Sequence, residues 1–284
     1  MNNNLLDMDL HRPQVMAIVN VTDDSFYADS RSGASSADVL RSLIERHILE
    51  GASIIDIGGY SSRPGACDVP LEEEWRRVEC GVAAVRSVSA DIPISIDTFR
   101  SEVVRRVVAR FGAVMVNDIS GGEADEQMWP TVAELGVPYV VMHMRGTPQT
   151  MQTMLSYDDV VAEVCGDLIA KAEQLRERGV RAENIVLDPG FGFAKSLEHN
   201  YLLLRGLHQL CEAGYPVLVG LSRKSMITRL LDITPEDALC GTQVLGWEAL
   251  RQGASILRVH DVAEAVQIAK IFRIYSNDKG YRCL

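Results

Sequence analysis

The chain has 284 residues, of which 47% are hydrophobic and 24% charged, a balance typical of a soluble globular protein with a sizeable core. Its 28 basic and 39 acidic residues give a net charge of −11, which argues against bulk binding to nucleic acid or to an anionic membrane. Six scattered cysteines without zinc-like spacing, and an N-terminus unlike a signal peptide, predict a cytoplasmic protein with reduced thiols. No apolar stretch approaches the roughly 20 residues that span a bilayer.

Eight short apolar runs predict buried parallel strands, because helices cover both faces of such a sheet and leave continuous β-branched sequences. In chain order they occupy residues 15–19, 54–57, 94–96, 114–116, 139–142, 185–187, 217–219 and 256–257. Each run ends in a polar, chemically capable residue. Since a (β/α)₈ barrel assembles its active site at the strand C-termini, the pattern predicts a fold and a site location together.

Helices are expected between the runs, and most of them close on a glycine before the next strand. The predicted helices cover residues 36–51, a segment that begins at 70, and residues 101–111, 124–135, 157–178, 197–213 and 235–252. Alternating strands and helices favour a parallel sheet with right-handed crossovers. Eight strands match a closed barrel better than an open doubly wound sheet. We expect one (β/α)₈ TIM-barrel domain over 1–284, with a short lead at 1–13 and a tail at about 276–284.

Three loops carry residues that suit phosphate or pyrophosphate. They are NVTDDSF at 20–26, GGYSSRPG at 58–65 and SRKS at 222–225. Glycines permit close backbone approach, hydroxyls donate hydrogen bonds, and Arg63 can meet paired oxygens bidentately. Taken alone, the 58–65 segment is equally compatible with a simple turn, because Gly, Pro and Ser cluster in loops.

The strand-end carboxylates are more informative. Asp97 and Asp188 follow buried strands, where an unpaired charge is expensive. With Asn117 and Lys224 they can satisfy a flat heterocycle that carries adjacent N–H donors and a carbonyl acceptor. One such aspartate is more typical of a helix cap, but four polar groups at one barrel mouth favour a ligand site.

Residues after the fifth, sixth and eighth runs extend this picture. Alternation aims Arg258 and His260 the same way, and loops after strands seven and eight of such barrels frequently bind phosphate. Met142 suits either soft contact with a ring or the barrel core. The loop 188–193 is either a ring-stacking loop or a simple connector. His143 lacks the spacing of a zinc site.

At these residues the sequence resembles the dihydropteroate synthase family, from about residue 15 to residue 262. Eight matching blocks occur in the family's order, at 18–26, 58–65, 96–98, 116–118, 142–144, 188–193, 222–225 and 258–261. The resemblance implies a (β/α)₈ barrel that acts as a transferase in folate biosynthesis and is a target of sulfonamides. The implied reaction joins 6-hydroxymethyl-7,8-dihydropterin pyrophosphate to 4-aminobenzoate and releases pyrophosphate with Mg²⁺. Members are typically homodimers paired through late helices.

The resemblance also assigns roles to residues. The residues expected to bind the pterin are Asp97, Asn117, Met142, Asp188, Lys224 and Arg258. The residues expected to bind pyrophosphate are Asn20, Arg63, Arg258 and His260, and Asn20 is also expected to bind the metal. The residues expected to bind aminobenzoate are Phe26, Ser62, Pro64, Phe193 and Ser225. Catalysis is expected to depend on Asp97, Asp188, Lys224 and Arg63.

Some positions depart from the family pattern. Asp23 stands where proline is usual, Tyr60 and Ser62 replace glutamate and threonine, and Ala17 and Ala194 replace frequent glycines. These changes remove no group that the chemistry needs. They bear on the behaviour of the first two loops and on sulfonamide affinity.

Two other functions share parts of this pattern. A methyltetrahydrofolate:corrinoid methyltransferase has a similar Asp/Asn pterin pocket but needs no pyrophosphate clamp, so Arg63, Arg258 and His260 favour the synthase. A catalytically silent pterin-binding or scaffold protein would be indicated by the loss of Asn20, Arg63, Lys224 or His260, and all four are present. The residues indicate no covalent enzyme intermediate.

Overall fold

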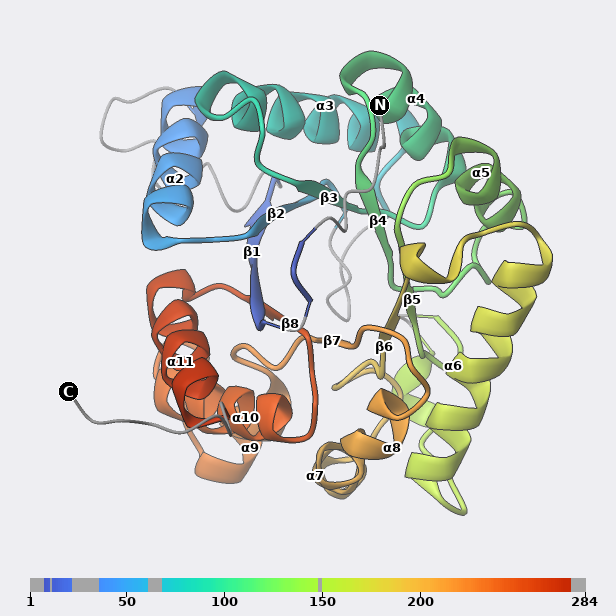
Figure 1. Cartoon of the computed structure of the whole chain (residues 1–284), viewed down its shortest axis with the longest axis vertical. Coiled ribbons are helices and arrows are strands. Elements are labelled where there is room, and N and C mark those ends of the chain that lie inside the picture. The colour runs from blue at the N-terminus through green and yellow to red at the C-terminus, as the bar shows by residue number, and fades with distance from the viewer. Residues whose placement is uncertain (1–7, 11, 22–35, 61–67, 148–149, 277–284) are drawn as a thin grey trace.

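The computed structural model describes residues 8–10, 12–21, 36–60, 68–147 and 150–276. Eight parallel strands form one sheet in the order β6-β5-β4-β3-β2-β1-β8-β7. A further parallel bridge joins Leu187 of β6 to Val217, next to β7, so the two ends of the sheet meet. Helices form a ring around the strands (Figure 1). The predicted (β/α)₈ barrel is confirmed.

Every predicted apolar run is a strand, with ends within two residues of the expected ones. The strands are β1 (Gln14–Asn20), β2 (Ile54–Gly58), β3 (Ile94–Asp97), β4 (Met115–Asp118), β5 (Tyr139–Met142), β6 (Ile185–Asp188), β7 (Leu218–Val219) and β8 (Ile256–Val259). Their outward side chains are almost entirely buried beneath the helices. Burial on both faces explains why these strands read as continuous apolar runs.

The helices of the ring are α2 (Ser36–Glu50), α3 (Leu71–Val88), α4 (Ser101–Phe111), α5 (Met128–Leu135), α6 (Val160–Glu177), α7 (Leu197–Arg205), α8 (Leu207–Cys211), α9 (Ser225–Leu231), α10 (Leu239–Arg251) and α11 (Val262–Tyr275). Short 3₁₀ turns occupy Met151–Thr153 and Ala182–Asn184. Within the described part of the chain, no helix combines the length and apolar character needed to cross a membrane.

Several helix boundaries differ from the prediction, each for a local reason. The helix expected over 197–213 is divided into α7 and α8 at Gly206, where a Cβ would stand only 2.8 Å from Val161 of α6. The glycine therefore allows close helix packing but weakens the helix. The helix expected from 124 begins only at Met128, because the Asp125 carboxylate accepts hydrogen bonds from the backbone of Ser101 and Gln127.

The remaining differences lie around the last two strands and α6. The helix expected from 157 begins at Val160, after Asp159 caps it by accepting from two backbone N–H groups. The helix expected over 235–252 begins at Leu239. Helices α9 and α11 were not predicted. The tail expected at about 276–284 falls almost wholly outside the described residues.

The interior of the barrel has two levels. The lower level is an apolar cluster at the N-terminal ends of the strands, and Met8 and Leu10 of the N-terminal lead pack against it. Its buried members are Met16, Ile54, Met115, Val140, Val186, Leu218 and Ile256. Two residues further along four of these strands, the same inward face presents the polar side chains of the upper level, Asp56, Asn117, Asp188 and Arg258.

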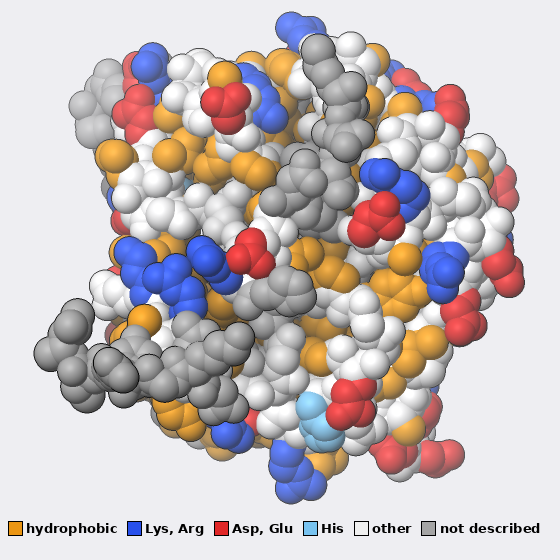
Figure 2. Space-filling model, in the orientation of Figure 1, with side chains coloured by type: hydrophobic (Ala, Val, Ile, Leu, Met, Phe, Trp, Pro, Cys, Tyr) orange, Lys and Arg blue, Asp and Glu red, His pale blue; other side chains and the backbone are white. Residues whose placement is uncertain are grey.

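Charge on the surface is distributed unevenly. Figure 2 shows Lys and Arg side chains gathered in one group on the left of the face in view, whereas acidic side chains are spread along its right-hand edge. The net charge of −11 is therefore not one uniform field on this face.

Candidate active site

The centre of the upper level is Arg258 of β8, held between two carboxylates. Its Nε lies 2.7 Å from Oδ2 of Asp56 on β2, and its Nη2 lies 2.7 Å from Oδ2 of Asp97 on β3. Asn117 of β4 donates to Asp56 Oδ2 over 3.3 Å. Four strands thus converge on one ion-pair network. Burial acts to lower the pKa of Arg258, but the two carboxylates outweigh it and hold the pKa above its ordinary value, so the guanidinium stays charged.

Asp97 is the titratable member of this network. Its pKa is raised to about 7, because burial and, to a lesser extent, the carboxylate of Asp56 outweigh the attraction of Arg258. One guanidinium serves two carboxylates, so their repulsion remains partly uncompensated. Asp97 is also the more accessible of the two, with 15% of its side chain exposed against 0% for Asp56. It can therefore change protonation near neutral pH and meet a ligand.

Asp56 is a site residue that the sequence analysis missed. It is fully buried, and its Oδ1 has no hydrogen-bond partner among the residues that the structure describes. A signal existed, because Asp56 interrupts an otherwise apolar strand, and an inward carboxylate at such a position needs a partner. Its partner lies 202 residues away in the sequence, where only the fold brings it close.

Asp188 and Lys224 form the second part of the polar level. Asp188, at the end of β6, accepts a 2.7 Å hydrogen bond from the backbone N–H of Gly190. Burial raises its pKa, while that hydrogen bond and the ammonium of Lys224 act in the opposite sense. Burial lowers the pKa of Lys224 to about 8, although Asp188 attracts its charge. Lys224 also feels Asp97 and Arg258, so the two parts belong to one site.

Apolar side chains line one flank of this site. Met142 ends β5 directly opposite Asp188 in register and is buried in a cluster with Ile119, Met144, Met151 and Ala194. Phe193 packs on the same cluster, and Nζ of Lys224 lies 4.3 Å from the centroid of its ring. A polar floor beside a soft apolar flank suits a flat, polar ring.

The edge of the barrel mouth, here called the rim, carries the predicted site residues His260 and Asn20. His260 Nδ1 lies 3.0 Å from Ser222 Oγ, which also accepts from the His260 backbone N–H. Asn20 ends β1 opposite Gly58 in register. A Cβ on Gly58 would lie 3.3 Å from Asn20 Oδ1 and 3.9 Å from Asp97 Oδ2, so the glycine keeps the space between them open.

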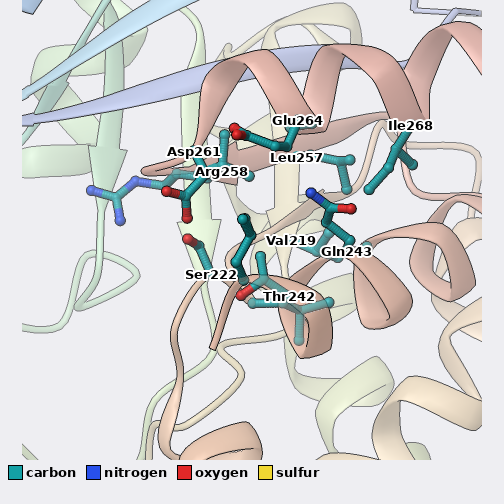
Figure 3. A pocket seen from close by; sticks show the side chains of 14 residues that line it. Val219, Ser222, Thr242, Gln243, Leu257, Arg258, Asp261, Glu264 and Ile268 are labelled. Carbon is teal, nitrogen blue, oxygen red and sulfur yellow. The ribbon is translucent and has the colours of Figure 1, made fainter. Parts of the chain in front are cut away.

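A separate pocket lies outside the barrel, between β7 and β8 on one side and α10 and α11 on the other. Figure 3 shows Val219, Leu257 and Ile268 in its apolar part, with Ser222 and Asp261 on another side. The guanidinium of Arg258 points away from this pocket, toward its carboxylate partners. The pocket is therefore distinct from the polar level, where the chemically capable groups converge.

The structure thus brings most predicted site residues to one barrel mouth. They are Asn20, Asp97, Asn117, Met142, Asp188, Phe193, Lys224, Arg258 and His260. Ser225 is the exposed first residue of α9. The predictions for Phe26, Ser62, Arg63 and Pro64 fall outside the described residues. Within the described ranges, no group of three or more His, Cys, Asp or Glu side chains is arranged to hold a metal ion.

Comparison with known proteins defines the class first. The family described as "Pterin binding enzyme" matches residues 16–260. The chain belongs to this family of pterin-binding enzymes.

Individual relatives then narrow the class. The chain is 42% identical over 277 residues to the dihydropteroate synthase of Haemophilus influenzae, covering 97% of this chain and 98% of the relative. It is 43% identical over 264 residues to the enzyme of Escherichia coli, covering 93% and 92%. These matches confirm the predicted resemblance to dihydropteroate synthases and favour it over the methyltransferase alternative.

Solved structures agree with the sequence relatives. A structure of Xanthomonas albilineans dihydropteroate synthase with 4-aminobenzoic acid superimposes with a TM-score of 0.86, at 41% identity and with 94% of each chain covered. A complex of the enzyme from the same organism with 7,8-dihydropteroate gives a TM-score of 0.84 at 38% identity, covering 95% of this chain and 96% of that one.

Proposed function

We propose that the polar level of this barrel condenses 6-hydroxymethyl-7,8-dihydropterin pyrophosphate with 4-aminobenzoate, giving 7,8-dihydropteroate and pyrophosphate. The observation that carries the proposal is Arg258 clamped between Asp56 and Asp97 beside Asp188 and Lys224. Relatives at 42–43% identity over nearly the whole chain are dihydropteroate synthases. The activity therefore has both a suitable site and a family precedent.

The pterin fits this site through its hydrogen-bonding edge. Asp97 and Asp188 accept from its ring N–H and amino groups, while Asn117 and Lys224 donate to its ring nitrogen and carbonyl. Arg258 lies over one face of the ring, and Met142 contributes a soft contact on the other. Burial of all these groups strengthens each charge-assisted hydrogen bond relative to water.

The substitution proceeds without a covalent bond to the protein. The C–O bond to pyrophosphate breaks first, and the electron-rich pterin delocalises the positive charge that forms at its exocyclic carbon. Asp97 and Asp188 stabilise that charge. The amino nitrogen of 4-aminobenzoate then forms the new C–N bond and releases a proton to solvent or to pyrophosphate. It needs no strong base, because an aniline is already neutral at pH 7.

The negative charge of the pyrophosphate leaving group is neutralised by residues at the edge of the barrel mouth. His260 and Arg258 lie on the side where β7 and β8 end, and we propose that Arg63 joins them. Mg²⁺ fits beside Asn20, whose amide oxygen is a hard donor facing the space that Gly58 keeps open. Mg²⁺ commonly takes one or two protein oxygens together with substrate phosphate oxygens. When bound it would neutralise charge on pyrophosphate.

The aminobenzoate ring belongs beside Phe193 and Lys224. Nζ of Lys224 lies 4.3 Å from the centroid of the Phe193 ring, and Ser225, the residue after Lys224 in the chain, is exposed. An aromatic carboxylate can pack on such a ring while its charge faces the lysine. Phe26, Ser62 and Pro64 complete the proposed subsite. A Yersinia pestis dihydropteroate synthase has been solved in complex with a sulfonamide drug, so we expect a sulfonamide to compete here.

Pairing through the last helices completes the proposal. Val244 on α10 and Ile271 and Tyr275 on α11 are 61%, 61% and 67% exposed, an apolar surface that a second copy of this chain can cover. Light scattering at micromolar concentration should give about twice the monomer mass. A monomeric mass would contradict the homodimer.

We also propose that the protein is located in the cytoplasm. Cys80, Cys165, Cys211 and Cys240 are all free thiols in the described part of the chain. Free thiols are typical of a reducing compartment.

The direct test is incubation with pterin pyrophosphate and 4-aminobenzoate, with and without Mg²⁺, and detection of dihydropteroate and pyrophosphate by mass spectrometry. We expect both products, in equal amounts, only when both substrates and Mg²⁺ are present. Folded protein that gives neither product would refute the proposed function. Products in the absence of Mg²⁺ would refute only the metal.

A further inference from the structure

We propose that Lys195 is a positioning residue, which holds the loop after β6 in the shape that aims Asp188 and Phe193 into the site. Lys195 is not part of the pterin or aminobenzoate contacts assigned above. Its side chain is buried, with 6% exposed. The inference rests on the proposed function, because it assigns the loop its purpose in that reaction.

The ammonium of Lys195 is surrounded by three acceptors. Its Nζ lies 3.0 Å from the carbonyl oxygen of Gly190, 3.1 Å from that of Phe193 and 3.0 Å from Nδ1 of His143. In the charged form of Lys195, the three hydrogens of the ammonium thus meet three acceptors. Two of the acceptors belong to the loop itself, and the third belongs to the residue that follows β5. One side chain therefore connects two positions of the loop after β6 to the residue that follows β5.

His143 is suited to accept this bond. It is 3% exposed, and burial together with the positive charge of Lys195 lowers its pKa to about 2. The ring is therefore neutral at physiological pH, and Nδ1 has a free lone pair when the proton is on Nε2. The backbone N–H of His143 also donates to the carbonyl of Asp188.

The loop needs such a brace because its backbone is tightly packed and, at Ala194, strained. Gly190 has φ +67°, which glycine adopts without strain, and a Cβ there would stand 2.0 Å from the carbonyl oxygen of His143. Ala194 has φ 49°, in the left-handed region that a side chain disfavours, and it is completely buried. Its carbonyl accepts from the hydroxyl of Tyr157. A strained conformation persists only when surrounding contacts over-determine it.

Burying an amine in this position costs stability. Among the described residues, no carboxylate lies within ion-pair distance of Lys195, and burial lowers its pKa to about 7. An apolar side chain of similar length would avoid that cost but would leave three buried acceptors without a donor. Lys195 therefore serves to hold those acceptors, and with them the loop, in place.

The braced loop carries two groups of the active site. The N–H of Gly190, whose carbonyl Lys195 binds, donates to Asp188 Oδ1 over 2.7 Å. Phe193, whose carbonyl Lys195 also binds, places its ring against Lys224. Loss of the brace should thus disturb Phe193 most, since Asp188 keeps its place at the end of a strand.

The first variant is Lys195→Met, which keeps the length and removes all three hydrogen bonds. We expect KM for 4-aminobenzoate to rise on the order of tenfold, more than KM for the pterin substrate. We expect Tm to fall, because three buried acceptors lose their donor. A merely structural lysine predicts the same fall in Tm but with both KM values changing together.

A pair at His143 provides the matched control. His143→Asn keeps an acceptor close to the place of Nδ1 and should retain wild-type KM values. His143→Leu should raise KM for 4-aminobenzoate as Lys195→Met does, but less, because it removes one of the three hydrogen bonds of Lys195. If Lys195→Met fails to fold, this pair decides. Equal KM values in the two His143 variants would overturn the inference, as would wild-type KM for aminobenzoate in a folded Lys195→Met protein.

Hydrogen exchange separates this inference from the proposed function. In Lys195→Met the amides of Gly190 and Gly192 should exchange at least about tenfold faster than in the wild type, with amides of β4 unchanged. Faster exchange without turnover by the wild type would refute the condensation and leave the brace standing. Unchanged exchange would refute the brace.

Discussion

The two levels of the barrel interior come from the same strands but obey opposite rules. On β2, Ile54 belongs to the apolar lower level and Asp56, two residues later, to the charged upper level. On β8, Ile256 and Arg258 show the same step. The period of two lets one strand support the core at one end and hold chemistry at the other. At the upper level the buried charges of Asp56, Asp97 and Arg258 pair with one another.

The largest expected effect comes from breaking that pairing. Arg258→Met would leave two buried carboxylates facing each other, so we expect the free energy of unfolding to fall by about 3–5 kcal/mol and turnover to be lost. Urea denaturation and the condensation assay measure both. The double variant Asp56→Asn/Arg258→Met should recover part of the stability but not the activity. Unchanged stability in the single variant would show that the ion pairs of Arg258 with Asp56 and Asp97 do not stabilise the fold.

A matched change in the lower level should separate stability from catalysis. Met115→Ala removes a buried side chain from the apolar cluster, and such cavities cost about 2–5 kcal/mol. We expect kcat and KM to stay within about twofold of the wild type at temperatures where the variant is folded. A selective loss of pterin binding would contradict the division into two levels.

Lys224→Ala should give the reverse pattern. Removing one charge-assisted hydrogen bond costs about 1.5–3 kcal/mol of binding, so the Kd for the pterin substrate should rise about ten- to hundred-fold. Stability should change little, because burial already lowers the pKa of this lysine to about 8. Calorimetric titration checks the affinity. Wild-type affinity would remove Lys224 from the pterin pocket.

The same network also predicts a pH dependence of stability. The pKa of Asp97 is about 7 in the folded protein, well above its value of about 3.9 in an unfolded chain. Between these values the folded state retains a proton that the unfolded state has released, so this group makes stability fall as pH rises from about 4 to 7. Asp97→Asn should flatten that slope in denaturation curves. An unaltered slope would contradict the assignment.

Much of this division could be predicted from the sequence. The apolar runs predict all eight strands, and the structure places Asp97, Asn117, Asp188 and Arg258 in the C-terminal parts of their strands, as predicted. The site role of Asp56 was not predicted, because Asp56 lies inside an apolar run and its partner Arg258 is distant in sequence. Such pairing depends on barrel closure, which no local pattern encodes.

Helix ends and loop shapes were harder, because they depend on single tertiary contacts. Gly206 divides a helix since α6 approaches it, and Asp125 delays another by binding the backbone of α4. Ala194 replaces a frequent family glycine yet keeps a left-handed backbone, with Lys195 and Tyr157 bonded to the loop around it. Side-chain propensity alone predicts none of these three results.

A crystal structure of this protein with 7,8-dihydropteroate tests the account most directly. The pterin edge should lie within hydrogen-bond distance of Asp97, Asn117, Asp188 and Lys224, beneath the guanidinium of Arg258. A pterin seated in the pocket between α10 and α11, or one that leaves the polar level empty, would contradict the assignment of chemistry to the upper level of the barrel.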